Sequence, residues 1–148
     1  MGPYIRLMKG KLKAYIASPL CHEEERKFAE KLDSLCKELG LDTFLPHRDA
    51  GLWKEGKPFE EIAKEDIKGF DGCDMIVANL NGFNIGAGTA WEMGYAHAKG
   101  IPVIGLKSDR KIEESVEEMS AIILGITKIV TSIDELRGEI MKLIQSSS

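Results

Sequence analysis

Residues 84–100, Asn-Ile-Gly-Ala-Gly-Thr-Ala-Trp-Glu-Met-Gly-Tyr-Ala-His-Ala-Lys-Gly, decide the fold of this chain. One short apolar run, residues 75–80, precedes this stretch, and another, residues 101–106, follows it. Runs of this kind are typical of buried strands in a parallel sheet. The stretch between them is therefore the helix of a β-α-β unit, and its start is predicted beside the carboxyl ends of the strands, where open α/β sheets bind ligands. Glu92 is thus predicted at the lip of a cleft.

The same stretch predicts where this helix begins and ends. Gly86 and Gly88 permit a tight turn from strand to helix, Thr89 is a favourable N-cap residue, and Gly100 provides the stop. Thr89 and Glu92 also fit a capping box, in which the glutamate binds back to the backbone of the cap residue. Glu92 therefore has two explanations, a structural cap and a functional carboxylate.

Composition limits the class of protein. The 148 residues suit one domain, and 43% hydrophobic with 30% charged residues is typical of a globular chain. The formal net charge of −4 gives no general attraction to a nucleic acid polymer or an anionic membrane, so a small ligand is the expected partner. We expect one domain over residues 1–148, with residues 1–10 as a loose leader and residues 146–148 as a tail.

Cysteine and histidine give no sign of a metal or a disulfide framework. The three cysteines include no C-x-x-C pair, and the three histidines are scattered without metal-ligand spacing. A reducing cytoplasm is the simplest setting for such a chain. No apolar run approaches the length of a membrane span, so neither a membrane location nor a metal site is predicted.

The rest of the chain alternates strand and helix patterns. Strand-like runs occupy residues 12–17, 42–46, 75–80, 101–106 and 128–130, and helical patterns occupy residues 23–39, 59–70, 112–124 and 133–145 in addition to the helix described above. Such alternation predicts a three-layer α/β domain with a five-stranded parallel sheet and right-handed crossovers.

Polar residues follow the first two strands at the edge where the glycine turn is also expected. Ser18 and Pro19 end the first strand, and His47 and Asp49 begin a polar connection, residues 47–57, of a length that often carries function. The alternative explanation of this connection is an ordinary solvated loop. Ligand binding through His47 and Asp49 is thus one of two interpretations.

Several common motifs are absent. Gly86-Ala87-Gly88 begins like a dinucleotide fingerprint, but Trp91 stands where its third glycine belongs, and the turn follows a late strand. The chain has no Gly-Lys-Ser/Thr of a phosphate-binding loop and no G-x-S-x-G nucleophile elbow.

Residues 88–96, Gly-Thr-Ala-Trp-Glu-Met-Gly-Tyr-Ala, closely resemble the Gly-Thr-Ala-x-Glu-x-Gly-Tyr-Ala signature of the nucleoside 2-deoxyribosyltransferase family. The resemblance extends over roughly residues 12 to 140. It implies a single flavodoxin-like, Rossmann-like domain, a nucleoside or nucleotide as substrate, a role in nucleotide salvage, and no cofactor. Glu92 would be the nucleophile, Tyr15 would contact it, Ser18 and Pro19 would line the sugar pocket, and Asp74 would assist proton movement near the base.

This chemistry suits two carboxyl groups. Attack by a carboxylate on the anomeric carbon divides a difficult displacement into two steps through a covalent ester, as in retaining glycosidases. Glu92 must be ionised to attack, and a place in the first turn of a helix would favour the charged form. The leaving base needs a proton, for which Asp74 is the candidate acid.

The chain also departs from the family pattern. Transferases usually carry an aspartate at the position of Gly86, and the related 2′-deoxynucleoside 5′-phosphate N-hydrolases carry a serine there and an arginine in the first loop, where this chain has Leu20-Cys21-His22. Ser120 could match a serine that binds phosphate in those hydrolases from a neighbouring subunit. Deoxyribosyl transfer is therefore the first interpretation, nucleotide N-hydrolysis the second, and a non-catalytic nucleotide-binding module the alternative of another class.

We also expect a homo-oligomer with shared active sites. Residues 121–124, Ala-Ile-Ile-Leu, end a predicted helix with apolar side chains on several sides, more than one buried face uses. The resemblance implies that a neighbouring subunit completes each active site. The alternative is that these residues are part of the core of a monomer.

Overall fold

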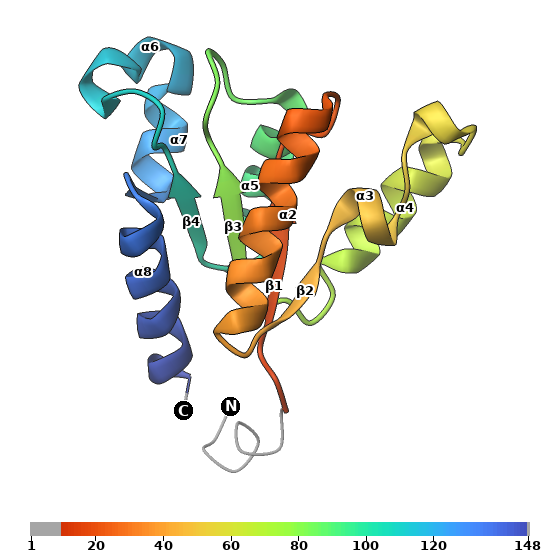
Figure 1. Ribbon diagram of the computed structural model, residues 1–148, viewed down its shortest axis with the longest axis horizontal. Coiled ribbons are helices and arrows are strands. Elements are labelled where there is room, and N and C mark those ends of the chain that lie inside the picture. The colour runs from red at the N-terminus through yellow and green to blue at the C-terminus, as the bar shows by residue number, and fades with distance from the viewer. Residues whose placement is uncertain (1–9, 148) are drawn as a thin grey trace.

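In the computed structural model, which describes residues 10–147, five parallel strands form one sheet in the order β2-β1-β3-β4-β5 (Figure 1). The strands are β1 (Lys13–Ala17), β2 (Asp42–Phe44), β3 (Met75–Asn79), β4 (Val103–Leu106) and β5 (Lys128–Val130). The strand order reverses between β1 and β3, which pair in register from Ala14 with Met75 to Ala17 with Ala78. This confirms the flavodoxin-like α/β fold and places the topological switch point beside the ends of β1 and β3.

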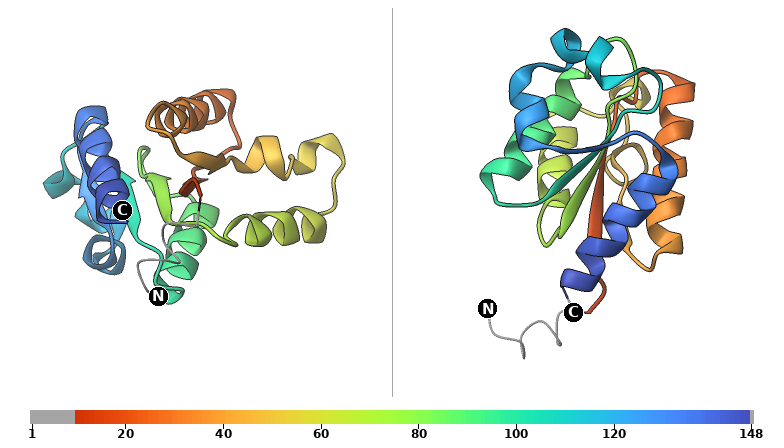
Figure 2. Two further views of the ribbon diagram at one scale, coloured as in Figure 1. Left: turned by 90° about the horizontal axis from the view of Figure 1, so that it is seen from below. Right: turned by 90° about the vertical axis from the view of Figure 1, so that its left-hand side faces the viewer.

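Helices cover both faces of the sheet (Figure 2). On one face α2 (Glu23–Glu38) and α8 (Ile133–Ser146) pack against the strands, and on the other α5 (Ala87–Ala98) packs together with the short helices α6 (Val116–Met119) and α7 (Ala121–Ile126). Every residue of β3 and β4 is buried, as apolar strands between two helical layers must be. Within residues 10–147, no helix has both the length and the apolar character that crossing a membrane requires.

The ends of the chain differ from expectation in one respect. Helix α8 continues through Ser146, the first residue of the expected tail, and the Ser146 hydroxyl donates to the carbonyl of Leu143 at 3.0 Å. Apart from Gly10, the leader expected for residues 1–10 lies outside the described residues.

Helix α4 (Phe59–Gly69) packs on the sheet only at its carboxyl end. With α3 (Pro46–Asp49) it extends beyond the sheet edge (Figures 1 and 2). Gly69 is required at the contact, since a Cβ there would lie 2.7 Å from the Phe44 ring. The predicted apolar face of α4 is therefore buried at Phe70 but not at Phe59, which is 71% exposed. Pro58 is the N-cap of this helix.

Residues 112–124 do not form the single helix that was predicted. They contain a 3-10 turn (Ile112–Glu114), α6 and part of α7, which continues beyond Gly125 to Ile126. The break lies at Ser120, whose φ of 68° is unusual for a residue with a side chain. Apolar periodicity does not reveal such a break, because the segments on both sides still bury apolar residues, Met119 and Ile123.

Candidate active site

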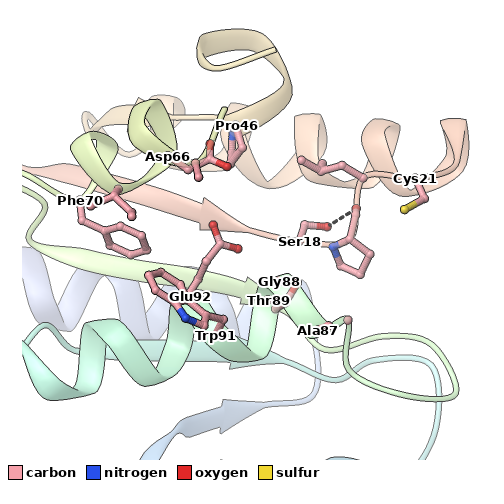
Figure 3. A pocket seen from close by; sticks show the side chains of 15 residues that line it. Ser18, Cys21, Pro46, Asp66, Phe70, Ala87, Gly88, Thr89, Trp91 and Glu92 are labelled. Atoms are coloured by element: carbon pink, nitrogen blue, oxygen red, sulfur yellow. Dashed lines mark hydrogen bonds between the residues drawn. The ribbon is translucent and has the colours of Figure 1, made fainter. Parts of the chain in front are cut away.

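A cavity of about 510 Å³ lies at the switch point, between α4, the start of α5 and the loop after β1 (Figure 3). Four segments supply its lining. These are the loop residues Ser18, Pro19, Leu20 and Cys21, the first residue of α3, Pro46, the residues Ala63, Asp66 and Ile67 of α4 with its C-cap Phe70, and the N-cap Gly86 with Ala87, Gly88, Thr89, Trp91 and Glu92 of α5. Most are apolar, with few polar groups among them, which is typical of a small-molecule site.

Glu92 projects from α5 into this cavity and is bound by Tyr15. The Tyr15 hydroxyl donates a hydrogen bond to Glu92 Oε2. Tyr15 is fully buried in β1, and its ring is stacked between those of Phe44 and Phe70, with centroid distances of 5.2 and 4.1 Å. Burial and the nearby Glu92 raise the pKa of Tyr15, so the hydroxyl keeps its proton and remains a donor. The predicted contact of Tyr15 with Glu92 is present.

Glu92 is harder to ionise than its predicted place in the helix suggests. Burial raises its pKa to about 8, the hydrogen bond from Tyr15 lowers it, and the nearby Asp66 carboxyl raises it. Helix α5 begins at Ala87, so Glu92 is its sixth residue and the first turn holds no acidic side chain. The helix dipole therefore does not have the favourable effect on Glu92 that was predicted, because that effect fades beyond the first turn.

The capping box predicted for Thr89 and Glu92 does not form. Gly86 is the N-cap residue, and its carbonyl accepts from the amide of Ala90 at 2.9 Å. Thr89 lies inside the helix, where its Oγ1 is buried and has no hydrogen-bond partner within the described residues. Since Glu92 does not cap the helix, the explanation of this residue as a helix cap is removed.

Asp66 is a site residue that the sequence analysis missed. It projects from α4 toward Glu92 across the cavity (Figure 3), and burial raises its pKa to about 6 against the lowering effect of Lys57. Its Oδ1 is buried without a hydrogen-bond partner in the part of the chain that is described. A signal existed in the sequence, because Asp66 interrupts the apolar stripe formed by Ala63 and Phe70 at helical spacing.

Asp74, the predicted acid, lies elsewhere. It precedes the first residue of β3, and its Oδ2 accepts a hydrogen bond from the amide of Lys13, the first residue of β1, at 2.8 Å. These amino ends of the strands lie opposite the cavity, and Asp74 does not line the cavity. The structure therefore does not bring Asp74 to Glu92, since a carboxylate before a parallel strand and a ligand site after it lie at different edges.

Ser18, Pro19, Gly86 and Gly88 line the cavity as predicted. The Ser18 hydroxyl accepts from Asn79 Nδ2 and donates to the carbonyl of Pro19, both at 3.1 Å. A Cβ on Gly86 would lie 3.1 Å from Pro19 Cγ, although its φ of −59° would suit any residue. Pro19 thus fills the space that the aspartate or serine of relatives would need, which gives a physical reason for the departure at Gly86.

His47 and Asp49 belong to a network against α2 and not to the cavity. Residues 46–49 form α3 in place of the expected loop, and only Pro46 lines the cavity. His47 Nε2 lies 3.0 Å from Glu30 Oε1, and Asp49 accepts from the amide of Leu45 and from Arg48. These contacts hold α3 in place, and neither His47 nor Asp49 lines the cavity, so the binding roles of these two residues stay predictions.

The loop from β3 to α5 is fixed to the loop after β4. Asn81 and Ser108 exchange two hydrogen bonds of 2.9 and 2.7 Å, and Gly82 is bound by Asp109 and by Lys107 at 2.8 and 2.9 Å. Lys107 is 1% exposed and pairs with Asp109 at 2.8 Å. These contacts hold the segment that leads into Gly86.

Ser120 and the possible metal ligands are the last groups to place. Ser120 is exposed at the junction of α6 and α7 and does not line the cavity of its own chain. Between residues 10 and 147, no group of three or more histidine, cysteine, aspartate or glutamate side chains is arranged to hold a metal ion.

The fold and the site define the class of protein. A cavity at the switch point of a flavodoxin-like domain, with two facing carboxyl groups of raised pKa, has the features of an enzyme site for a small molecule. The sequence model of the nucleoside 2-deoxyribosyltransferase family matches residues 14–124. The chain belongs to this family.

Several solved structures share this fold. A conserved protein from Enterococcus faecalis V583 has 26% sequence identity and a TM-score of 0.69 over 90% of this chain and 99% of its own. A 2-deoxyribosyltransferase from Bacillus psychrosaccharolyticus has 23% identity and a TM-score of 0.69 over 84% of this chain and 90% of its own. A CMP N-glycosidase from Clostridium botulinum has 19% identity and a TM-score of 0.57 over 92% and 99%. No match was found among curated proteins.

The contact between Tyr15 and Glu92 leads to a prediction for pH dependence. Tyr15→Phe removes the donor that lowers the pKa of Glu92, so this pKa rises above its value of about 8 and less carboxylate exists at neutral pH. We expect base release at pH 7 to fall about tenfold, since one pKa unit changes the ionised fraction about tenfold. We also expect the limb of the pH profile that reports the titration of Glu92 to move to higher pH. Tyr95→Phe is the matched control; an unchanged limb in Tyr15→Phe would contradict the prediction.

Proposed function

We propose that this protein cleaves the N-glycosidic bond of deoxynucleosides or their 5′-monophosphates through a covalent glycosyl ester on Glu92, and passes the sugar to another base or to water. The observation that carries the proposal is the pair of carboxyl groups, Glu92 and Asp66, that face each other across one cavity (Figure 3). Family membership supports the reaction class. Asp66 takes the role that the sequence analysis gave to Asp74.

The proposed reaction has two steps. The carboxylate of Glu92 attacks C1′ of the sugar, the bond from C1′ to the base nitrogen breaks, and protonated Asp66 donates a proton to the leaving base. In the second step a water molecule or the nitrogen of another base attacks C1′, Asp66 accepts the proton from it, and Glu92 leaves as a carboxylate. Configuration at C1′ is retained, as after any two displacements.

The pair of carboxyl groups holds one proton at neutral pH. With a pKa of about 6 for Asp66 and about 8 for Glu92, this singly protonated state lies between these two values. These values place the proton mainly on Glu92 in the resting enzyme. The reactive form is the minor tautomer with the proton on Asp66, and the hydrogen bond that Tyr15 donates to the Glu92 carboxylate increases its share. At lower pH both groups are protonated and no nucleophile exists, and at higher pH both are ionised and no acid exists. The proposal therefore places maximal activity of the free enzyme between about pH 6 and 8.

A second candidate is hydrolysis of nucleotides, and one observation favours it. Gly88, in the first turn of α5, has open space where a side chain would lie, and the buried Thr89 Oγ1, without a partner in the described chain, belongs to the same lining. Backbone amides at a helix start favour an anion such as a 5′-phosphate. The loop at this end also binds two cationic side chains, Arg26 and Lys54, which donate to the carbonyl of Cys21 at 3.1 and 3.0 Å.

One assay separates these functions. Deoxynucleosides and their 5′-monophosphates are incubated with the enzyme and a labelled acceptor base, and free base, free sugar and labelled product are measured. We expect base exchange accompanied by substantial hydrolysis, since Gly86 offers no carboxylate to hold the sugar while a second base enters. Sugar phosphate without any labelled nucleoside would make the enzyme a nucleotide N-hydrolase. No free base from any substrate would indicate a non-catalytic binding module.

We further propose that the chain forms a homo-oligomer with shared active sites. Exposed apolar side chains support this proposal, with Ile122 69% and Val116 45% exposed near Ser120. Within the predicted apolar segment 121–124, Ile123 is buried and Leu124 packs against the same core, so the core explanation accounts for two of the four residues. We expect light scattering to give at least the mass of a dimer; a monomeric mass at the concentration of the activity assay would contradict this.

A further inference from the structure

The two ends of the cavity differ in chemistry. One end is formed by the loop after β1 and the first turn of α5, and it offers backbone amides and the hydroxyls of Ser18 and Thr89. The other end lies between α4 and α5 and is formed by Ala63, Ile67, Phe70 and Trp91. Glu92 and Asp66 lie among these groups (Figure 3). A ligand with one polar and one flat apolar half would therefore be bound in a single orientation.

Trp91 is exposed at the cavity and is held in place by neighbouring aromatic rings. The side chain is 54% exposed at the cavity, although indole is among the largest apolar groups. On one side it stacks on Tyr95, with 5.2 Å between ring centroids and 18° between planes. Tyr95 in turn packs on Phe70 at 5.0 Å, and Phe70 stacks on Tyr15 at 4.1 Å. A continuous series of rings thus holds the indole in place and leaves part of its surface free.

The lining offers little else with which to recognise a base. Among the described residues that line the cavity, there is no asparagine, glutamine or arginine, the side chains that commonly form paired hydrogen bonds with base edges. Aromatic side chains bind bases through their π faces, and this contact tolerates different bases because every base has such a face. Recognition at the apolar end must therefore depend mainly on stacking and apolar contact.

We propose that Trp91 is the platform on which the nucleobase of the substrate stacks, with the sugar held at the loop end of the cavity. The inference rests on the proposed function and extends it to the choice of substrate. Stacking selects by ring area and not by the pattern of donors and acceptors. The enzyme accordingly accepts purine and pyrimidine substrates, and it favours purines by a few-fold because they cover more of the indole.

Binding of free bases tests the platform directly. The chain has two tryptophans, so Trp53→Phe leaves Trp91 as the single indole, and Trp91→Phe leaves Trp53, which is 56% exposed and does not line the cavity. Adenine and cytosine are titrated against each variant. We expect saturable quenching of fluorescence in Trp53→Phe, stronger with adenine, and no saturable change in Trp91→Phe. The two variants carry the same substitution and differ only in position.

Kinetics test the same platform during turnover. In Trp91→Ala we expect kcat/KM for purine substrates to fall about tenfold, equal to about 1.4 kcal/mol, through a higher KM, with a smaller fall for pyrimidines. A merely structural role of the indole would lower kcat and move the pH profile, because it would disturb the rings that support Tyr15. Trp53→Phe is the control and should retain wild-type kinetics.

The outcomes separate this inference from the proposed function. An active enzyme whose Trp91 is not quenched, or whose Trp91→Ala variant keeps its KM, overturns the platform and leaves the function standing. A fall in kcat with an altered pH profile and unchanged KM also overturns it. Saturable quenching of Trp91 in a protein that releases no base from any substrate supports the base site and refutes the proposed reaction.

Discussion

Glu92→Gln is expected to abolish base release and to leave the protein folded. The amide is nearly isosteric, and its oxygen can still accept the hydrogen bond from Tyr15. It cannot attack C1′, so we expect turnover to fall by about four orders of magnitude or more, as for other covalent nucleophiles. Chromatography of released base, together with intact-mass spectrometry of enzyme quenched during turnover, measures both the rate and the sugar adduct on the wild-type protein.

The same variant should be more stable than the wild type at alkaline pH. The folded state raises the pKa of Glu92 to about 8, above its ordinary value of 4.5, so the folded protein binds more protons than the unfolded chain between these values. Its stability therefore falls as pH rises through this range. The amide of the variant is neutral at every pH, so its folded state does not lose stability in this way. Compared with the wild type, we expect the free energy of unfolding of the variant to be about 1–3 kcal/mol higher at pH 8 and no higher near pH 4.5.

A matched control distinguishes the site from a general charge effect. Glu24→Gln makes the same substitution on the exposed first turn of α2 and should change neither base release nor the pH dependence of unfolding. Glu92→Gln with turnover within a few-fold of the wild type would refute Glu92 as the nucleophile. Equal destabilisation by Glu92→Gln at every pH would instead show that the carboxylate has a structural role.

Much of the fold could be predicted because it depends on patterns that extend over several residues. Residues 75–79 and 103–106 are buried throughout, and strands buried on both faces need no polar alternation. Features that depend on one backbone angle or one contact could not be predicted in this way. The positive φ of Ser120 divides a segment whose composition is that of a continuous helix.

The start of α5 is another feature that the sequence pattern does not predict correctly. Thr89 is predicted as the N-cap because its hydroxyl can accept a hydrogen bond from the helix backbone, which glycine cannot do. The helix instead begins three residues earlier, at Ala87, with Gly86 as its cap, and Thr89 becomes a buried residue of the helix. A shift of this size is ordinary for a helix boundary predicted from sequence. Here it moves Glu92 out of the first turn, so the helix dipole does not lower the pKa of this carboxyl, and burial raises it instead.

Topology could have excluded Asp74 as the second carboxylate of the site. In a parallel sheet, residues before a strand and residues after it lie at opposite edges, so the order of the elements is enough to place Asp74 away from the glycine turn. Asp66 required a different argument, because its contact with the cavity depends on how α4 leans away from the sheet. That packing follows from Gly69 and Phe44, two residues far apart in sequence.

Asp66→Asn and Asp74→Asn should therefore have very different effects. The amide in Asp66→Asn cannot protonate the leaving base, and loss of a general acid typically costs about 10²- to 10⁴-fold in rate. The amide in Asp74→Asn keeps an oxygen that can accept the hydrogen bond from the backbone of Lys13, so we expect activity within about twofold of the wild type. Rates of base release from the two purified variants decide between the carboxylates; a large loss in Asp74→Asn with an active Asp66→Asn would reverse the assignment.

The pH profile and the leaving group make this test specific for proton donation. Without Asp66 the fall in activity at high pH should disappear, because no catalytic acid remains to lose its proton. The profile should become a single rise to a plateau, centred below about pH 8 because Asp66 no longer raises the pKa of Glu92. A base that leaves readily without protonation should also lose less rate in Asp66→Asn than a poor leaving base does. An equal loss for both kinds of base, with an unchanged bell-shaped profile, would mean that Asp66 positions the substrate and does not donate the proton.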